Sequence, residues 1–534
     1  MADRFDAVVV GAGFAGLYML HKLRGLGLSA RVFEAGDGVG GTWYWNRYPG
    51  ARCDVESIEY SYGFDEDLEQ EWEWTERYAT QPEILRYLEH VADRFDLRRD
   101  IQLNTRVSSA TFDDDANCWT VRTENGDEVT AQFVIMATGC LSSANMPVFP
   151  GQDSYAGRIL HTGQWPHEEV DFTGLRVGVI GTGSSAIQSI PIIAEQAASL
   201  VVFQRTANYS VPAHNRRLDD DELAEAKRNY RDLRRANRQS MVGFGGWLAP
   251  SEYSALGVDD ETRKRILDER WDRGGLTFLG GFTDALLLPD ANEKVADYVR
   301  DQIRSIVKDP DVADVLSPKQ VIGCKRLCVD TGYYATFNRD NVRLIDINQD
   351  PIEELTPAGL RTRSESFDFD VIVFATGFDA MTGALLKIDV RGSDGVSLHD
   401  AWSEGPRTYL GLSVPGFPNM FTITGPQSPS VLTNMVTSIE QHVEWIADCI
   451  THVGNLGRIE ATREAADAWV DHCNMIADFT LFPTCNSWYL GANIPGKKRV
   501  FMPLIGFFPY AQRCDEVAAN GYEGFVIRSA QPTG

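Results

Sequence analysis

The sequence has 534 residues, a length that predicts roughly three to four domains. Its 43% apolar and 24% charged residues are typical of a globular protein that buries large cores. The net charge of −26 argues against a nucleic-acid partner and against binding to anionic membranes. An anionic cofactor would therefore need local positive sites, such as helix N-termini or individual basic side chains.

The nine cysteines are scattered along the chain and form no pair with metal-binding spacing. We expect them to be reduced thiols in a cytoplasmic protein, and we expect no metal site. Residues 7–10 are apolar but strand-like and lead directly into Gly11, so that no signal peptide is predicted. No apolar run of the sequence reaches the length of a bilayer-spanning helix.

Near the N-terminus, a strand-like run over residues 6–10 leads into a glycine turn and then into apolar residues at helical spacing over 14–26. The turn carries the three glycines of a G-x-G-x-x-G motif, Gly11, Gly13 and Gly16. Such glycines allow backbone N–H groups at a helix N-terminus to approach a pyrophosphate. Glu34 ends the next strand, where a carboxylate accepts hydrogen bonds from an adenosine ribose, so this unit suits FAD or NAD.

A segment rich in glycine and aromatic residues follows at 40–54, with the sequence G-G-T-W-Y-W-N-R-Y-P-G-A-R-C-D. We expect no regular element there. Wide, flat side chains beside glycines suit a flavin ring, although an aromatic core cluster fits the same composition. An amphipathic helix is expected at 81–95. The strands of a β-meander are expected at 101–112, 119–123 and 128–135, and the last of them ends in an A-T-G turn.

A second unit with the organisation of the first follows at residues 176–203. The strand-like run Arg176–Ile180 leads into a G-x-G-x-x-A turn formed by Gly181, Gly183 and Ala186. A single turn of this kind is compatible with an ordinary strand–helix connection. In each unit, 23 residues separate the first glycine of the turn from the residue at the end of the next strand, which contacts the adenosine ribose. Two such turns with the same spacing favour two dinucleotide sites.

The two units differ at the residue that ends this strand. Gln204 stands where the first unit has Glu34, and Arg205 and Thr206 follow it. A carboxylate would repel the 2′-phosphate of NADP, whereas an arginine fork binds it. We therefore expect FAD on the first unit and NADPH on the second.

The segment from about 212 to 320 is expected to be a helical insertion. Its expected helices cover residues 216–239, 261–273 and 292–307. Its many charged residues indicate a solvated cover with no assigned chemistry.

After the insertion, strands are expected at 324–330 and 341–346, and another at 371–374 ends in a second A-T-G turn. Helices at 432–450 and 464–480 and a long loop at 486–503 complete the chain. The sequence thus predicts the α/β fold class, with two dinucleotide-binding (Rossmann-like) domains and a helical insertion. The expected ranges are 1–140 and 379–534 for the FAD-binding domain, 141–211 and 321–378 for the NADP-binding domain, and 212–320 for the insertion.

Between the two nucleotide turns lies the sequence Y-A-G-R-I-L-H-T-G-Q-W-P, at residues 155–166. It resembles the fingerprint F-x-G-x-x-x-H-x-x-x-W-P/D of type I Baeyer–Villiger monooxygenases, with Tyr155 in place of the usual Phe. The matching residues are Tyr155, Gly157, His161, Trp165 and Pro166. The resemblance extends over nearly the whole chain, including A-T-G-F-D at 375–379, G-P-Q-S-P-S-V-L at 425–432 and S-W-Y-L-G-A-N-I-P-G-K at 487–497. The chain is most similar to the phenylacetone, steroid and cyclohexanone monooxygenases.

The resemblance implies an enzyme that uses FAD, NADPH and O₂ to convert a ketone to an ester or lactone through a C4a-peroxyflavin, with sulfides as further substrates. Arg326 matches the arginine near the flavin that is essential for oxygenation, and Asp54 matches the carboxylate that orients it. His161 corresponds to a residue that links domain motion rather than one that takes part in the chemistry. The implied substrate pocket consists of Ser430, Val431, Leu432 and Met435.

The resemblance also implies the cofactor contacts. Beside the glycines of the first turn, FAD would contact Thr42, Trp43, Asp54, Tyr60 and Val107. Beside Gly181 and Gly183, NADPH would contact Thr182, Ser184, Ser185 and Gln188. Its 2′-phosphate would be held by Arg205, Thr206 and Lys325. Trp488 matches a tryptophan on a loop that closes over NADP.

Two alternatives stay open. A flavin-containing N/S-monooxygenase shares both turns but uses a protonated, electrophilic peroxide, and it usually lacks the tryptophan found here at Trp165. A non-catalytic NADP-binding redox sensor would show no oxygen-dependent NADPH turnover. A flavin disulfide reductase is rejected, because it needs a redox cysteine pair near the flavin and Cys53 stands alone. We expect a monomer whose partners are a small-molecule ketone and O₂, and the 425–432 loop favours aryl or bulky ketones.

Overall fold

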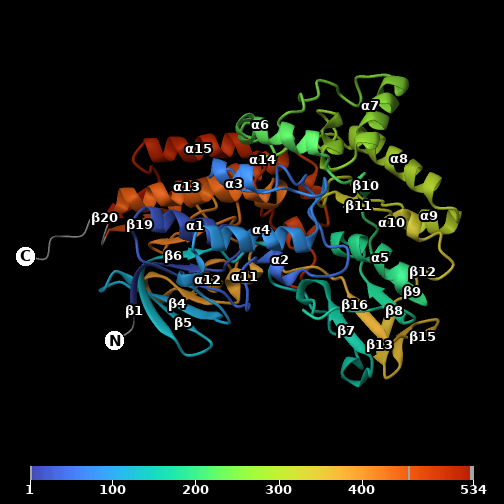
Figure 1. Ribbon diagram of the computed structural model, residues 1–534, viewed down its shortest axis with the longest axis horizontal. Coiled ribbons are helices and arrows are strands. Elements are labelled where there is room, and N and C mark those ends of the chain that lie inside the picture. The colour runs from blue at the N-terminus through green and yellow to red at the C-terminus, as the bar shows by residue number, and fades with distance from the viewer. Residues whose placement is uncertain (1–2, 455–456, 529–534) are drawn as a thin grey trace, which may run out of the picture.

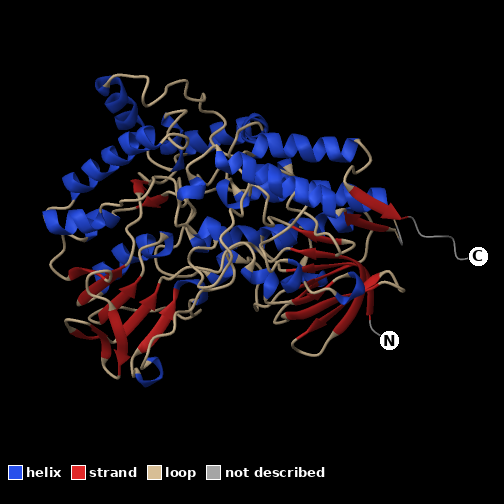
Figure 2. Ribbon diagram, turned by 180° about the vertical axis from the view of Figure 1, so that it is seen from behind, coloured by secondary structure: helices blue, strands red, loops and turns tan. Residues whose placement is uncertain are grey.

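The computed structural model describes residues 3–454 and 457–528. Two β-sheets lie at opposite ends of the molecule, and the longest helices pack along one side of them (Figure 1). Figure 2 shows the same two sheets from behind, with loops and short helices between them. The α/β fold class with two separate sheets is therefore confirmed.

The first sheet has eight strands in the part of the chain that the structure describes, in the order β17-β4-β5-β6-β1-β2-β3, with β18 beside β6. They are β1 (Asp3–Val10), β2 (Ala30–Phe33), β3 (Ile101–Gln102), β4 (Val107–Asp113), β5 (Cys118–Thr123), β6 (Glu128–Met136), β17 (Asp389–Arg391) and β18 (Met420–Thr422). β1 runs parallel to β2 and β6, whereas β4, β5 and β6 form the predicted antiparallel meander. The expectation of one strand over 101–112 was wrong, because Asn104 (φ 52°) adopts a left-handed conformation that separates β3 from β4.

Helices cover one face of this sheet, and their side chains form one apolar core with it. Helix α1 (Phe14–Gly25) packs against the sheet and against α13 (Met435–Val453). The same core receives side chains from α4 (Gln81–Arg94), α14 (Arg463–Asp478) and α15 (Phe507–Ala519). α13 begins three residues later than expected, because Asn434 caps it by accepting a hydrogen bond from the Val436 N–H at 3.1 Å.

Over residues 3–454 and 457–528, the second sheet has five strands, all parallel, in the order β12-β9-β8-β16-β7. They are β7 (Arg158–His161), β8 (Arg176–Ile180), β9 (Ser199–Gln204), β12 (Val342–Asp346) and β16 (Val371–Phe374). One face is covered by α5 (Ser184–Gln196). The other is covered by the antiparallel strands β13 (Ile352–Thr356), β14 (Gly359–Thr362) and β15 (Ser366–Asp368), through a cluster that includes Phe203, Phe367 and Phe374.

The insertion consists of α6 (Asp220–Arg238), α7 (Asp260–Arg273), α8 (Pro289–Ile306) and α9 (Pro310–Leu316), at the upper right of Figure 1. As expected, most residues of the insertion are exposed or half-buried, but one face of it belongs to a core. Val295, Val299 and Ile303 of α8 are fully buried in the same core as the second sheet. On α6, the half-buried Arg234 forms an ion pair with Glu69 at 2.8 Å. The insertion therefore packs on both halves of the chain.

The remaining short elements connect these parts. They are α2 (Thr42–Trp45), α3 (Glu66–Glu71), α10 (Tyr333–Thr336), α11 (Gly383–Leu386), α12 (Leu398–Ala401), β10 (Ser210–Pro212), β11 (Cys328–Asp330), β19 (Arg458–Ala461) and β20 (Phe525–Arg528). α2 lies where no regular element was expected, directly after Gly41, which has a positive φ of 54°. The expected strand over 324–330 is shorter, because only Cys328–Asp330 pairs, with β10. Among the described residues, no helix combines the length and the apolar character needed to cross a membrane.

Candidate active site

The first glycine turn is closed by close backbone contacts and by a fixed carboxylate. Gly11 has a φ of 105°, and a Cβ there would lie 2.6 Å from the carbonyl oxygen of Ala137. A Cβ at Gly16 would lie 1.8 Å from the carbonyl oxygen of Gly11, so α1 can start this close to β1 only with glycine. Glu34 accepts a 2.8 Å hydrogen bond from the Ala12 N–H, which fixes its carboxylate beside the turn.

The second glycine turn repeats this arrangement. Gly181 has a φ of 113°, and a Cβ there would lie 2.4 Å from the carbonyl oxygen of Ala375. A Cβ at Gly183, in contrast, would meet no described atom within 4 Å. Protein packing therefore does not explain this glycine, whereas the approach of a pyrophosphate to the N-terminus of α5 does. Ala137 and Ala375 begin the two A-T-G turns, so each A-T-G turn packs behind one glycine turn.

The end of β9 presents unpaired polar groups. Gln204 donates to the Val315 carbonyl oxygen at 2.7 Å, but its buried Oε1 atom has no hydrogen-bond partner among the described residues. Among the residues that the structure describes, neither Arg205 nor Lys325 has an acidic partner in an ion pair. The pKa of Lys325 is lowered by burial and by the nearby positive charge of Arg205. Two adjacent cations without an acidic partner fit an anionic group such as a 2′-phosphate.

Residues around this turn are tied to each other. Thr182 Oγ1 donates to the Thr206 carbonyl oxygen at 2.9 Å, which joins the turn to the segment after β9. The hydroxyls of Ser185 and Thr162 lie 3.0 Å apart, and Ser184 Oγ lies 3.3 Å from Cys328 Sγ. These contacts hold the first turn of α5 in position.

Gln188 has a role that the sequence did not indicate. Its side chain accepts a hydrogen bond from the Tyr48 hydroxyl at 2.8 Å and donates to the Arg52 carbonyl oxygen at 3.0 Å. Both partners belong to the first half of the chain, so Gln188 bridges the two halves. Its contact with NADPH stays a prediction.

The aromatic segment at 40–54 packs on the first glycine turn. A Cβ at Gly41 would lie 2.8 Å from Gly13 Cα, which leaves room for no other residue type. α2 then carries Thr42 and Trp43, and Trp43 Nε1 donates to the Tyr60 hydroxyl at 3.2 Å. Val107, in contrast, is buried in an apolar cluster of the first sheet, and its contact with FAD stays a prediction.

Arg326 and Asp54 form a two-point ion pair, although 272 residues separate them in the sequence. Arg326 donates from Nε to one carboxylate oxygen at 2.5 Å and from Nη2 to the other at 2.9 Å. Its Nη1 donates to the Val431 carbonyl oxygen at 2.8 Å. The side chains are 20% and 27% exposed. Burial alone would lower the pKa of Arg326, but the adjacent Asp54 carboxylate raises it above its ordinary value, so the guanidinium stays charged.

The four expected pocket residues lie together beside this pair. Ser430, with a φ of 30°, and Val431 belong to a 3₁₀ turn at Ser430–Leu432, and Met435 opens α13. Val431 is buried in a cluster against which Leu432, Met435 and Trp488 pack. The structure thus brings the pocket residues and the expected closing-loop tryptophan into contact with one apolar cluster.

Residues 486–503, which we call the closing loop, are anchored to the second A-T-G segment. Lys497 Nζ lies 2.5 Å from an Asp379 oxygen and 2.9 Å from the Ala380 carbonyl oxygen. Asn493 donates to the Phe378 carbonyl oxygen at 2.7 Å. Sequence reasoning missed these anchors. Both ends lie in motifs that were recognised, but no local signal pairs residues more than 100 positions apart.

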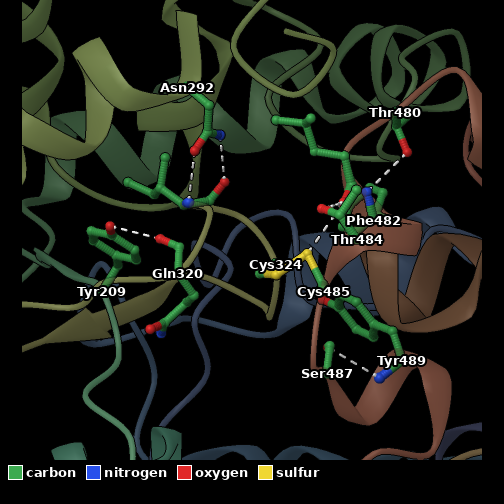
Figure 3. The surroundings of a disulfide bond; sticks show 12 residues. Tyr209, Asn292, Gln320, Cys324, Thr480, Phe482, Thr484, Cys485, Ser487 and Tyr489 are labelled. Carbon is green, nitrogen blue, oxygen red and sulfur yellow. Dashed lines mark hydrogen bonds between the residues drawn. A yellow bond between two sulfur atoms is a disulfide. The ribbon is translucent and has the colours of Figure 1, made fainter. Parts of the chain in front are cut away.

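The expectation that all nine cysteines are reduced thiols was wrong. Cys324 and Cys485 form a disulfide with their Cα atoms 5.7 Å apart, within the ordinary range (Figure 3). The other seven cysteines are free. Cysteine spacing gave no signal for this pair, since 161 residues separate its members. No cluster of three or more His, Cys, Asp or Glu residues within the described chain could hold a metal ion.

The fingerprint residues belong to the second sheet and the cores on its two faces. Tyr155 donates to the Phe369 carbonyl oxygen at 3.0 Å, and a Cβ at Gly157 would lie 2.2 Å from the Tyr155 hydroxyl oxygen. His161 ends β7, with Nε2 3.2 Å from Thr376 Oγ1 of the second A-T-G turn. Burial lowers the pKa of His161. Trp165 is buried in the core of the second sheet.

Residues 8–227 match the family model described as pyridine nucleotide-disulphide oxidoreductase. The chain is 46% identical to a Baeyer–Villiger monooxygenase of Pseudooceanicola batsensis, covering 98% of this chain and 96% of the relative. It is 43% identical to a phenazine N-monooxygenase of Lysobacter antibioticus, covering 98% and 97%.

Among solved structures, an oxidized steroid monooxygenase bound to NADP is 55% identical and superimposes with a TM-score of 0.94, over 99% of this chain and 100% of the other. The protein OTEMO in complex with FAD and NADP is 40% identical, with a TM-score of 0.95 over 99% of this chain and 100% of the other.

Proposed function

This chain belongs to the Baeyer–Villiger monooxygenase family, and from that premise we propose that its Arg326–Asp54 pair is the catalytic centre. The chain is an FAD- and NADPH-dependent monooxygenase that converts ketones to esters or lactones with O₂. The observation that best supports this catalytic centre is the position of Arg326. Its guanidinium is fixed by Asp54 on one side and by the Val431 carbonyl of the pocket turn on the other.

Two groups of residues would hold the cofactors. Glu34 and the glycines of the first turn, with Thr42, Trp43 and Tyr60, would hold FAD, and Val107 completes this proposed set. The second turn would hold NADPH, with Arg205, Thr206 and Lys325 at its 2′-phosphate. The remaining proposed contacts to NADPH are Thr182, Ser184, Ser185, Gln188 and Trp488. When bound, the two cofactors supply the reducing equivalents that activate O₂.

The work of Arg326 is electrostatic. A ketone carbon is attacked much faster by an oxygen nucleophile that carries negative charge than by its neutral form, and a fixed guanidinium stabilises negative charge beside it. Lysine would supply a charge but not the planar fork that meets both oxygens of Asp54 while also reaching Val431. Asp54 thus acts as a positioning residue for Arg326.

The substrate class follows from the residues around the pair. Ser430, Val431, Leu432 and Met435 carry no charge. Val431, Leu432 and Met435 pack with Trp488 in one apolar cluster, and the Ser430 hydroxyl contacts Met381 of that cluster. An apolar enclosure of this kind favours an uncharged ketone with a bulky or aryl substituent over a charged one.

N-oxygenation is a second candidate reaction, and one observation favours it. The phenazine N-monooxygenase of Lysobacter antibioticus aligns with nearly the whole chain at 43% identity. Sulfide oxidation belongs to the same class, because nitrogen and sulfur are attacked by an electrophilic oxygen. The products formed from matched ketone, sulfide and aromatic N-heterocycle substrates distinguish these reactions.

We also propose the domain ranges 1–140, 141–211, 212–320, 321–378 and 379–534. The separation of the strands between two sheets supports them, since β7 and β16 belong to one sheet and β17 and β18 to the other. We further propose a monomer in the cytoplasm. The seven free thiols support that compartment, and light scattering after size-exclusion chromatography tests the oligomeric state.

The decisive test is the Arg326→Ala variant, assayed with linear, cyclic, aromatic and steroidal ketones. We expect NADPH oxidation to continue and ester formation to stop, because the variant keeps both glycine turns and loses the fixed charge. Normal ester formation would remove Arg326 from the mechanism. Absence of ketone-dependent ester formation in the wild-type protein would contradict the ketone reaction itself.

A further inference from the structure

The disulfide joins the two segments that carry the proposed functional residues. Cys324 directly precedes Lys325 and Arg326, and Cys485 directly precedes the closing loop with Trp488. We propose that this disulfide is a redox-dependent modification site that positions the closing loop over the dinucleotide at the Gly181 turn. The inference rests on the proposed role of the closing loop in covering NADP.

The Cys324 side of the bond is held rigidly by the insertion. Asn292 of α8 is buried and donates to the carbonyl oxygens of Ala285 at 2.7 Å and Ile322 at 3.0 Å. It also accepts a hydrogen bond from the Ile322 N–H at 3.0 Å (Figure 3). Because Ile322 lies two residues before Cys324, the sulfur is fixed relative to α8 and to Arg326.

On the Cys485 side, a tight turn connects the sulfur-bearing residue to Trp488. The Cys485 N–H donates to the Phe482 carbonyl oxygen at 3.0 Å, and the Ser487 hydroxyl accepts from the Tyr489 N–H at 3.2 Å (Figure 3). Tyr489 is buried, and its ring centroid lies 4.3 Å from that of Trp488. Only two residues separate Cys485 from Trp488, so a shift of the sulfur moves the indole.

The closing loop is thus fastened covalently before residue 486 and by the Lys497–Asp379 ion pair near its other end. The covalent bond limits the conformations of the loop before NADP binds, so less freedom is lost on binding. Reduction removes this advantage and leaves the ionic anchor. We expect reduction to raise the Kd for NADP⁺ about 3- to 10-fold, the range expected from releasing one ordered side chain.

The redox step is a thiol–disulfide exchange. Two small-molecule thiols R–SH give up two electrons and two protons, the Cys324–Cys485 bond breaks to two protein thiols, and R–S–S–R is released. The reverse step uses an oxidised small-molecule disulfide. In a cytoplasmic protein such a bond would be exposed to reducing thiols, and disulfides there are usually transient or redox-sensing.

Reductant and NADP should oppose each other. Cys324 and Cys485 are 4% and 9% exposed, so a thiol reaches them only when the closing loop moves away. NADP⁺ that holds the loop closed keeps both sulfurs covered and therefore slows their reduction. Because coupling between two sites is reciprocal at equilibrium, bound NADP⁺ also favours the disulfide over the two thiols by the factor by which the disulfide favours NADP⁺ binding.

The experiment uses the FAD-loaded enzyme. Unfolding and alkylation without reductant, followed by mass spectrometry, should label seven cysteines, and after dithiothreitol treatment nine. NADP⁺ should slow the appearance of the two additional labels. Titration calorimetry should give a 3- to 10-fold higher Kd for NADP⁺ with Cys485→Ser than with the wild type. The matched control Cys118→Ser, in the distant strand β5, should leave the Kd unchanged.

Trypsin gives a readout independent of turnover. The closing loop contains Lys497, Lys498 and Arg499, and cleavage there should be faster in Cys485→Ser. Should that variant fail to fold, dithiothreitol-reduced wild type takes its place in each measurement. Nine labelled cysteines without reductant, or equal Kd values and cleavage rates, would overturn the inference. Failure of the wild type to bind NADP⁺ at all would instead contradict the proposed function.

Discussion

Replacing Asp54 with Asn tests whether the two-point ion pair, and not only the presence of Arg326, supports oxygenation. The amide keeps the shape of the carboxylate but only one acceptor oxygen, and its NH₂ group faces a guanidinium N–H. One of the two charge-assisted hydrogen bonds, now 2.5 and 2.9 Å long, is therefore lost. The bond to the Val431 carbonyl remains, so Arg326 is loosened and not expelled.

The size of the effect follows from that single bond. A hydrogen bond to a charged group contributes about 1.5–3 kcal/mol. Solvent replaces little of it, because both side chains are largely buried. At about 1.4 kcal/mol per factor of ten, ester formation should slow about 10- to 150-fold. NADPH oxidation should change much less, since the glycine turns are untouched.

The assay is the amount of ester formed per NADPH consumed, with hydrogen peroxide measured as the uncoupled product. Asp370→Asn is the matched control, because Asp370 forms the same two-point pair with Arg176, at 3.2 and 2.9 Å, but on the surface. The control should keep the wild-type yield. If Asp54→Asn also kept it, orientation of Arg326 by Asp54 would not be needed for oxygenation.

Three further predictions concern the nucleotide turn, the phosphate site and a buried acid. Gly183→Ala should change the free energy of unfolding by no more than about 0.5 kcal/mol but should weaken NADPH binding. Gly181→Ala should lower the free energy of unfolding by about 1–3 kcal/mol, and equal urea unfolding midpoints for the two variants would contradict this. Arg205→Ala or Lys325→Ala should raise the KM for NADPH at least about 10-fold and the KM for NADH less than about twofold. Because its pKa is lowered, Lys325 loses its proton as the pH rises, so the wild-type KM for NADPH should increase with pH. Lys325→Arg, which stays charged, should flatten this pH profile. Burial raises the pKa of Glu59 from 4.5 to about 7, so the folded state holds a proton that the unfolded state releases between those values, and stability should fall as pH rises through that window. Glu59→Gln should remove up to about 3 kcal/mol of that fall, and identical pH profiles of thermal unfolding for the two proteins would refute it.

The sequence predicted the structural elements that follow from local patterns, but it did not predict the contacts between distant segments. The glycine turns and the long helices follow from patterns within about 30 residues, so they could be placed in advance. The Cys324–Cys485 bond, the Lys497–Asp379 pair and the bridge from Gln188 to Tyr48 each join segments more than 100 residues apart. No periodicity encodes such contacts. The Arg326–Asp54 pair is equally distant and was predicted only through resemblance to a family.

The fingerprint residue His161 lies where the two A-T-G segments meet. The two A-T-G segments, where the chain passes between the sheets, pair with each other: the Asn145 N–H donates to the Gly377 carbonyl oxygen at 2.9 Å, and Thr376 Oγ1 donates to the Asn145 carbonyl oxygen at 2.6 Å. His161 contacts Thr376 at this crossing. Each A-T-G turn also packs behind one glycine turn, through the backbone oxygen of its alanine. We therefore propose that a change at His161 alters the relation between the two nucleotide turns, and with it the transfer of electrons between bound cofactors.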